Sequence, residues 1–160
     1  MKTFKIRPLK KDDQDWVIPL LTEYWGSARI VTCGKILQAD ELPGFAAIQN
    51  GKKVGLITYR IDGDGCEIGS MNSLVEGIGV GTALVEAVKK VAQKAGCRRL
   101  WLITTNDNIK APRFCQKRGF ALAAVYPNAV DKSRKLKPEI PLVGNDGIPI
   151  RDELELEMIP

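Results

Sequence analysis

The chain has 160 residues, of which 44% are hydrophobic and 27% are charged, and its formal net charge at pH 7 is +5. This length and mixture fit a single folded domain over residues 1–160 with a sizeable core. No apolar run approaches the roughly 18 residues that a membrane span needs, and the N-terminus lacks the apolar core of a signal peptide. We therefore expect a cytoplasmic protein with no membrane partner.

The absence of histidine and the spacing of the cysteines exclude several kinds of catalytic and metal site. The chain has no histidine, which removes a Ser-His-Asp triad, a Cys-His dyad and most zinc catalysis. Its four cysteines form no Cys-x-x-Cys pair, so we expect reduced thiols and no metal. Basic residues are interleaved with acidic ones, which makes nucleic acid an unfavoured partner. A general base must therefore be a carboxylate or act through water.

The first part of the chain predicts a strand, a helix and a segment of unclear structure. Residues 4–9 alternate enough for a strand, and Asp12 or Asp13 can cap a helix that runs to Tyr24. Residues 28–42 have no clear period, and we assign no element to them.

Three antiparallel strands are predicted next. Residues 45–49 and 53–60 indicate a hairpin, because Asn-Gly at 50–51 suits the positive φ angles of a tight turn. After a second turn at 62–65, residues 66–71 add the third strand.

A glycine-rich loop and the helix after it form the strongest local signal. Glycine stands at positions 77, 79 and 81, and an amphipathic helix pattern runs on to Gly96. Glycines at alternate positions let the backbone expose its amides, and the start of a helix adds a partial positive charge. The loop from Gly77 to Thr82 is thus a candidate site for a phosphate or pyrophosphate, with a plain strand-to-helix turn as the alternative. Neither the Gly-x-Gly-x-x-Gly fingerprint nor a P-loop is present.

The rest of the chain predicts three strands, a helix and a long connection. Residues 100–103 are typical of a buried strand, and a helix opens at 106–108 and closes at 118–120. Residues 121–126 and 153–158 are the last two strands, the final one with strict alternation. Between them lies a connection of unusual length.

The order of these features resembles the GNAT N-acetyltransferase superfamily. The residues that carry the resemblance are Glu76-x-x-Gly79-x-Gly81, then a helix and a strand, then Asn108-x-x-Ala111-x-x-Phe114-Cys115-x-x-x-Gly119-Phe120. The family has Gln/Arg-x-x-Gly-x-Gly/Ala for its cofactor and commonly Asn-x-x-Ala-x-x-Phe-Tyr-x-x-x-Gly-Phe after it. The resemblance implies an α/β (α+β) fold, with a central mixed, mostly antiparallel sheet of about six to seven strands flanked by about four helices.

The resemblance also implies an activity and a cofactor site. The chain would be an acetyl-CoA-dependent N-acetyltransferase that acetylates a primary amine of a small molecule or protein by direct attack in a ternary complex. The pantetheine arm of acetyl-CoA would enter between two splayed parallel strands, where the Met71 backbone holds it and polarises the thioester carbonyl. Asn108 would bond the arm and Phe114 would line it. The amides that would cradle the pyrophosphate belong to Gly77, Ile78, Gly79, Val80, Gly81 and Thr82.

One carboxyl group and one thiol group are candidates for proton transfer. Glu67 lies four residues before Met71 on the strand that enters the cofactor site, so we expect both side chains on one face and Glu67 as the base. The alternative is an exposed strand glutamate. Cys115 occupies the usual position of the family's tyrosine acid and is far shorter, so it is either a general acid or a buried thiol. Glu76 replaces the family's Gln or Arg and puts a negative charge beside the expected pyrophosphate.

The acceptor site and the partners are less well defined. In the family, the first two helices and their connection form one wall of the acceptor pocket, and Trp25 and Arg29 are our candidates for it. The alternative is a packed tryptophan and a solvated arginine. The connection at 127–151 has an apolar half that could form a small hairpin. Its basic half could meet an anionic acceptor, the cofactor's phosphates or a second subunit, or remain solvated; this half contains Lys132, Arg134, Lys135 and Lys137.

Two further alternatives concern the whole chain. A catalytically weak GNAT-like acyl-CoA-binding or sensor module would keep the cofactor site without turnover. A projecting arm at 127–151 and an edge strand would also permit a homodimer.

Overall fold

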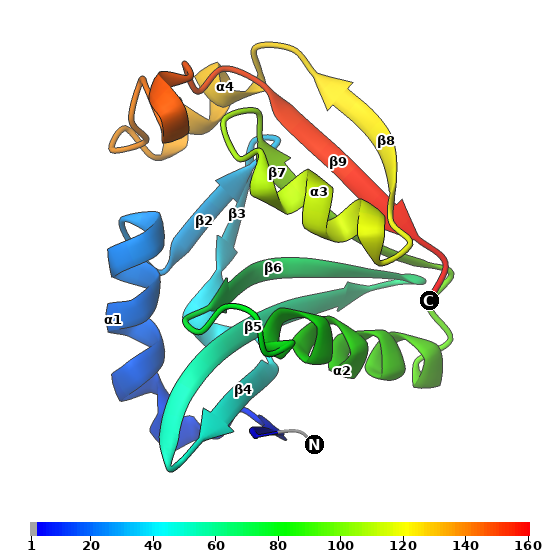
Figure 1. The fold of residues 1–160 in the computed structure, drawn as a ribbon. Coiled ribbons are helices and arrows are strands. Elements are labelled where there is room, and N and C mark those ends of the chain that lie inside the picture. Colours follow the sequence, from blue (N-terminus) through cyan, green and yellow to red (C-terminus); the bar gives the residue numbers. More distant parts are fainter. Residues whose placement is uncertain (1–2) are drawn as a thin grey trace.

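The computed structural model describes residues 3–160, which fold around one seven-stranded sheet (Figure 1). Its strand order is β1-β4-β5-β6-β7-β9-β8, and every neighbouring pair is antiparallel except β6 and β7, which run parallel. The strands are β1 (Lys5–Pro8), β4 (Gly44–Gln49), β5 (Lys52–Asp62), β6 (Gly65–Ser73), β7 (Arg99–Thr105), β8 (Ala121–Tyr126) and β9 (Glu153–Met158). This is the mixed, mostly antiparallel sheet that the family resemblance implies.

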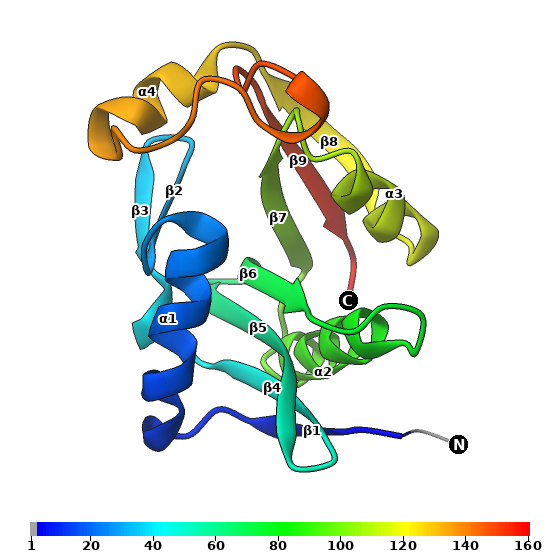
Figure 2. The same ribbon diagram turned by 60° about the vertical axis from the view of Figure 1, so that its left-hand side comes forward.

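Helices cover both faces of this sheet (Figure 2). The four helices are α1 (Gln14–Trp25), α2 (Val80–Lys94), α3 (Lys110–Lys117) and α4 (Ala129–Leu136). Three short 3-10 turns are η1 (Lys11–Asp13), η2 (Ala39–Glu41) and η3 (Asn145–Gly147), and a separate two-stranded sheet consists of β2 (Arg29–Thr32) and β3 (Lys35–Gln38). α1 and this small sheet lie on one face, which we call the hairpin face. α2 and α3 lie on the other, which we call the helix face.

Each face has its own apolar cluster. α2 presents an apolar stripe to the sheet, and this stripe packs with Ile57, Ile68, Leu100 and Leu156 from four strands. The residues of the stripe are Val80, Leu84, Val85, Val88 and Ala92. On the hairpin face, side chains of α1 pack with Ile30, Leu37 and Leu56. Burial of these side chains from both sides keeps the sheet rigid beneath the candidate site.

The predicted hairpin at the centre of the sheet is confirmed. β4 and β5 are joined at Asn50 and Gly51, whose φ angles of 51° and 75° are the left-handed values that a tight hairpin turn requires. β6 then pairs with β5 in the antiparallel sense, as predicted.

The segment 28–42, to which the sequence assigns no element, has regular structure. It forms the β2–β3 hairpin and η2, where the family resemblance suggested a second helix. Cys33 and Gly34 turn the chain with φ angles of 47° and 73°. Ile30 and Leu37, which face one another across the two strands, are both buried against α1. A tight turn with an apolar pair on either side outweighs the weak periodicity of the segment.

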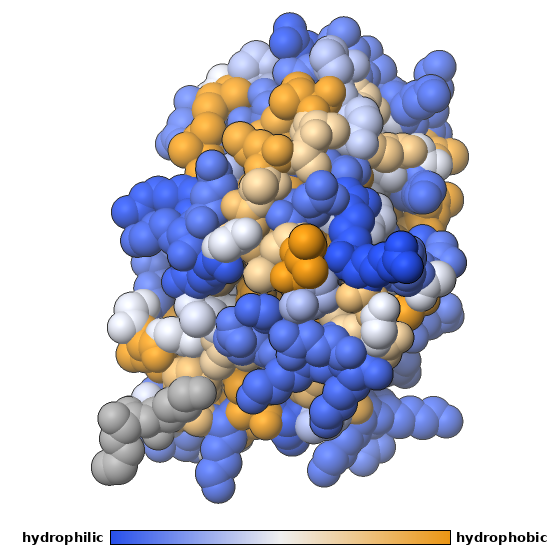
Figure 3. Space-filling model, turned by 90° about the vertical axis from the view of Figure 1, so that its right-hand side faces the viewer, coloured by the Kyte–Doolittle hydropathy of each residue, from blue (hydrophilic) through white to orange (hydrophobic). Residues whose placement is uncertain are grey.

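β8 forms one outer edge of the sheet. It pairs with β9 alone, and its Leu122 and Val125 are more than half exposed. Figure 3 views this side of the molecule, where several hydrophobic side chains gather in the upper part of the face. No helix within residues 3–160 is long and apolar enough to cross a membrane.

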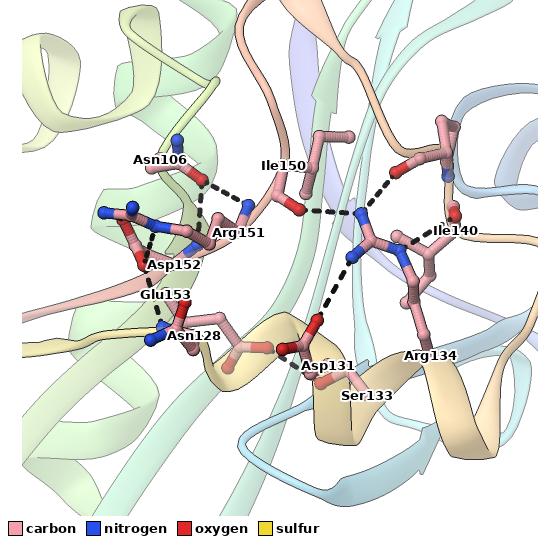
Figure 4. A network of polar contacts seen from close by, with 11 residues as sticks. Asn106, Asn128, Asp131, Ser133, Arg134, Ile140, Ile150, Arg151, Asp152 and Glu153 are labelled. Atoms are coloured by element: carbon pink, nitrogen blue, oxygen red, sulfur yellow. Dashed lines mark hydrogen bonds and ion pairs between the residues drawn. The ribbon is translucent and has the colours of Figure 1, made fainter.

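The connection at 127–151 is folded, and hydrogen bonds join it to the rest of the domain (Figure 4). Its basic half forms α4, and its apolar half contains a bridge between Val143 and Pro149. Asn106, which follows β7, accepts hydrogen bonds from the backbone N–H groups of Arg151 and Asp152. The predicted small hairpin is therefore present as a short bridged loop, but α4 was not predicted.

The same connection is also tied to α1. Lys137 is 5% exposed, and its Nζ donates to the carbonyl oxygens of Trp25 and Arg29, the latter at 2.6 Å. Arg29 Nη2 donates in return to the carbonyl of Leu136 at 2.7 Å. The arm thus packs across the end of α1 and does not project from the molecule.

Candidate functional site

β6 and β7 separate soon after they meet. Their parallel pairing covers three residue pairs, from Gly65 with Arg99 to Glu67 with Trp101. Beyond Glu67 the two strands diverge, as Figure 2 shows. A β-bulge lies at this point, because the partners on β5 shift so that Gly69 has none.

The backbone of Met71 faces the gap between the two strands. Leu74 N–H donates to the carbonyl of Val54, on the β5 side of β6. Backbone groups in an antiparallel pair alternate in direction, so those of Asn72 also point to β5 while those of Met71 and Ser73 point toward β7. The gap therefore has free backbone donors and acceptors along one edge.

The glycine loop lies between the end of β6 and the start of α2. Gly77 and Gly79 have φ angles of +81° and +86°, and a Cβ atom added to either would meet no other atom within 4 Å. Gly79 is the N-cap of α2, so the amides of the first helical turn have no partner within the helix. Exposed amides, open space and the positive end of the helix dipole fit the pyrophosphate of CoA.

Phe114 lies against this loop, and Asn108 lies at the start of α3. A Cβ atom on Gly81 would come within 3.1 Å of the Phe114 ring, so the ring packs directly on the first turn of α2. Asn108 Oδ1 accepts a hydrogen bond from the Ala111 N–H and thereby caps the start of α3. Its predicted bond to the cofactor arm would have to use the amide nitrogen.

A basic residue that sequence reasoning missed stands at the same place. Arg118 Nε donates to Thr82 Oγ1 at 2.7 Å, and its guanidinium carbon lies 3.7 Å from the centre of the Phe114 ring. A basic residue one helical turn after Phe114 was the available signal, because residues four apart share a helix face.

Glu67 lies on the hairpin face, and the expectation that it shares a face with Met71 is wrong. Met71 packs in the cluster of the helix face together with Ile68, the residue next to Glu67. The bulge at Gly69 is the physical reason, since one extra residue reverses the alternation between positions 67 and 71.

The surroundings of Glu67 suit a proton acceptor. The residue is 5% exposed, and its nearest cation is Arg60 Nη2 at 4.0 Å. Burial raises the pKa of the Glu67 carboxyl, and the positive charges of Arg60 and Lys35 oppose this shift. The buried Nε of Arg60 has no hydrogen-bond partner within residues 3–160, so this corner holds polar groups that a bound molecule could satisfy.

Two hollows open on the hairpin face. The smaller one, of about 80 Å³, adjoins Glu67, Arg60 and Trp101. The larger one, of about 470 Å³, lies between the tip of the β2–β3 hairpin at Cys33 and the start of α4. Burial first, and then the carboxylates of Glu153, Glu155 and Glu67, raise the pKa of the Cys33 thiol at the larger hollow to about 12.

Cys115 is 2% exposed and belongs to the apolar cluster of the helix face. Burial raises the pKa of its thiol to about 11, against a smaller opposing effect of Arg118. This position favours the buried-thiol alternative over a general acid.

Trp25 and Arg29 lie together at the end of α1 that faces the arm. Trp25 is 37% exposed, and its Nε1 donates to Asn72 Oδ1 on β6 at 3.3 Å. It is therefore not a packed core residue, and it adjoins the strand that carries Met71. The guanidinium of Arg29 is engaged with the carbonyl of Leu136.

Comparison with known proteins agrees with this geometry. The pattern of the Acetyltransferase (GNAT) family matches residues 11–120. The chain therefore belongs to the GNAT acetyltransferase family, and its fold is the GNAT fold.

Particular relatives support the same placement. The chain is 52% identical over 133 residues to the uncharacterized protein YdhI of Bacillus subtilis, which covers 82% of this chain and 83% of that protein. Its fold is similar to that of an IAA acetyltransferase from Bacillus cereus (TM-score 0.77, 19% identity, 98% and 99% of the two chains covered). It is also similar to a GNAT family acetyltransferase from Elizabethkingia anophelis with acetyl-CoA bound (TM-score 0.70, 18% identity, 100% of both chains covered).

Proposed function

We propose that this chain transfers the acetyl group of acetyl-CoA to a primary amine of a small molecule or protein, in a ternary complex of enzyme, acetyl-CoA and acceptor. The observation that carries the proposal is the gap between β6 and β7. It has the open glycine loop at one end and the buried carboxylate of Glu67 at the other. A GNAT family acetyltransferase of similar fold has acetyl-CoA bound.

Each part of the site has a distinct role in this proposal. Acetyl-CoA supplies the acetyl group as a thioester. The amides from Gly77 to Thr82 bind the pyrophosphate, and the Met71 backbone orients the arm and polarises the thioester carbonyl. The acceptor approaches from the hairpin face, where Trp25 and Arg29 border its pocket.

Glu67 is the base in this reaction. Its carboxylate takes the proton from the attacking amine, directly or through one water molecule. Burial suits it to this task, because it raises the pKa of the Glu67 carboxyl and a raised pKa makes the carboxylate a stronger base. The departing thiolate takes its proton from water, since the Cys115 thiol lies within the core.

A second candidate function is an acyl-CoA-binding module with little turnover. The burial of Cys115 at the family's tyrosine position favours it, because no side chain of the motif is then left to protonate the thiolate. Binding of acetyl-CoA without turnover across a broad panel of amines would support this alternative over the enzyme.

Calorimetric titration with acetyl-CoA is the first test. Gly79→Glu should abolish saturable binding, because it strains a left-handed backbone and adds a negative charge at the pyrophosphate position. Gly63→Glu is the matched control: Gly63 also has a positive φ, of 60°, and open space around it, but it lies in the β5–β6 turn. Absence of binding to the unaltered protein, or equal binding by both variants, would contradict the proposed cofactor site.

A further inference from the structure

Arg118 is held in one orientation at the start of α2. Its Nε donates to Thr82 Oγ1 at 2.7 Å, and its Nη1 donates to the Phe114 carbonyl at 2.9 Å. Its guanidinium also lies over the Phe114 ring at 3.7 Å, and that ring packs on Gly81. Three contacts thus fix a long side chain that would otherwise lose rotamer entropy on binding a ligand.

The charge of Arg118 has no carboxylate partner within residues 3–160. Both of its hydrogen-bond acceptors are neutral oxygens, and no ion pair reaches it. A guanidinium has five N–H donors, and the two bonds use two of them. A half-buried cation with free donors is therefore already in place beside an anion site.

Thr82 extends the same arrangement. It is the third residue of α2, so its side chain points back toward the helix start. Its hydroxyl oxygen accepts from Arg118, which leaves the hydroxyl hydrogen free to donate to another acceptor.

We propose that Arg118 supplies the cationic contact to the diphosphate of CoA in this chain, with Thr82 as a second donor. The proposal rests on the proposed function. Glu76 stands at the first position of the glycine motif, where its charge repels a diphosphate. The positive charge of Arg118 offsets that repulsion, and a guanidinium is well suited to phosphate because its donors can bind two oxygens at once.

The test compares substitutions of two arginines that lie five residues apart, Arg118 and Arg113. Arg118→Gln should weaken acetyl-CoA binding in calorimetry by about 10- to 100-fold, the range for loss of a charged hydrogen bond. Arg113→Gln is the control, since Arg113 is exposed on the same helix, and its affinity should stay within about twofold of the unaltered protein. Arg118→Lys keeps the charge without the fork and should give an intermediate affinity; it also serves if Arg118→Gln does not fold.

Ligand variation identifies the phosphate involved. Dephospho-CoA lacks the 3′-phosphate, and Arg118→Gln should weaken its binding by the same factor. Loss of the effect with dephospho-CoA would assign Arg118 to the 3′-phosphate and overturn the proposal. Equal acetyl-CoA affinity of the Arg118 and Arg113 variants would overturn it as well.

Inorganic diphosphate separates this proposal from the proposed function. If the unaltered protein binds diphosphate through Arg118 but does not bind acetyl-CoA, the proposed function and the contact to CoA both fail, and Arg118 is left as an anion-binding residue. If it binds acetyl-CoA and Arg118 has no effect, only the role of Arg118 fails. If it binds neither, both fail.

Discussion

Glu67 combines burial with a lack of strong partners. It is 5% exposed, and among residues 3–160 the one ion pair that reaches it spans 4.0 Å, at the limit of such contacts. A carboxylate in this position is costly when charged, and burial accordingly raises its pKa. The protein keeps it at the point where β6 and β7 part, which is the natural place for a proton acceptor in the proposed reaction.

Glu67→Gln should lower the rate of acetyl transfer by on the order of 10²-fold or more, because the amide cannot accept the amine proton. The unaltered protein should show an acidic limb in its pH–rate profile with an apparent pKa above 4.5, the ordinary value for Glu. The variant should lose that limb. An unchanged profile in the variant would rule out Glu67 as the base.

The same substitution should change the pH dependence of stability. With a folded-state pKa above the unfolded one, the folded protein binds more protons, so the free energy of unfolding falls as pH rises above about 4.5. Glu67→Gln should remove this decline and raise the melting temperature at pH 7, while below pH 4 the two proteins should differ little. Melting curves across pH check this. The prediction is contradicted if the melting temperature of the variant, compared with that of the unaltered protein, is no higher at pH 7 than at pH 4.

The arm and the β2–β3 hairpin form the rim of the hairpin face. Lys137 joins the end of α4 to the end of α1, and Asp107, after β7, accepts two hydrogen bonds from Asn145 in the arm. The start of α4, whose far end Lys137 ties to α1, lines the larger hollow opposite the hairpin tip. Acceptor specificity in the proposed reaction would therefore depend on how firmly the arm is attached.

Lys137→Met should detach the arm from α1. The substitution keeps an unbranched stem but leaves two carbonyl oxygens without their donor, at a cost of about 1–3 kcal/mol for each such group. For a chain of this size each kcal/mol lowers the melting temperature by about 2–4 °C.

Lys135→Met is the control, because Lys135 is an exposed residue of α4. This variant should melt like the unaltered protein. Limited proteolysis should also cut the Lys137 variant faster within residues 127–151. Equal melting and cleavage of the two variants would show that the Lys137 contacts do not hold the arm.

The molecule as a whole is two half-sheets that share a short junction. β6 and β7 are joined over three residue pairs, and a ligand in the gap would contact both halves. The outer strand β8 leaves a sheet edge with exposed Leu122 and Val125. Such an edge would permit a homodimer, although the arm does not project to assist it.

Acetyl-CoA should therefore stabilise the whole fold. At a free concentration of 100 Kd, binding to the folded state contributes about 2.7 kcal/mol. This should raise the melting temperature by roughly 5–10 °C in a chain of this size. Thermal shift measurements check the effect, and Gly79→Glu should show none. An equal shift in that variant would mean that the ligand binds elsewhere.

Local signals were enough for the cofactor loop and most of the strands. The alternate glycines, the Asn-Gly turn at 50–51 and the strict alternation at 153–158 each specify backbone geometry within a few residues, and the structure has the predicted elements there. Family motifs placed Phe114 and the loop together, and the two do lie in contact.

Long-range pairing accounts for what the sequence could not predict. The face on which Glu67 lies depends on the bulge at Gly69, and a bulge is defined by the partner strand rather than by the residues of its own strand. The hairpin at 28–42 is held by packing against α1, and the orientation of Arg118 by a ring and a hydroxyl that belong to two helices. Periodicity and turn chemistry act over a few residues, whereas these features depend on contacts between segments that are distant in the chain, which form only when the chain has folded.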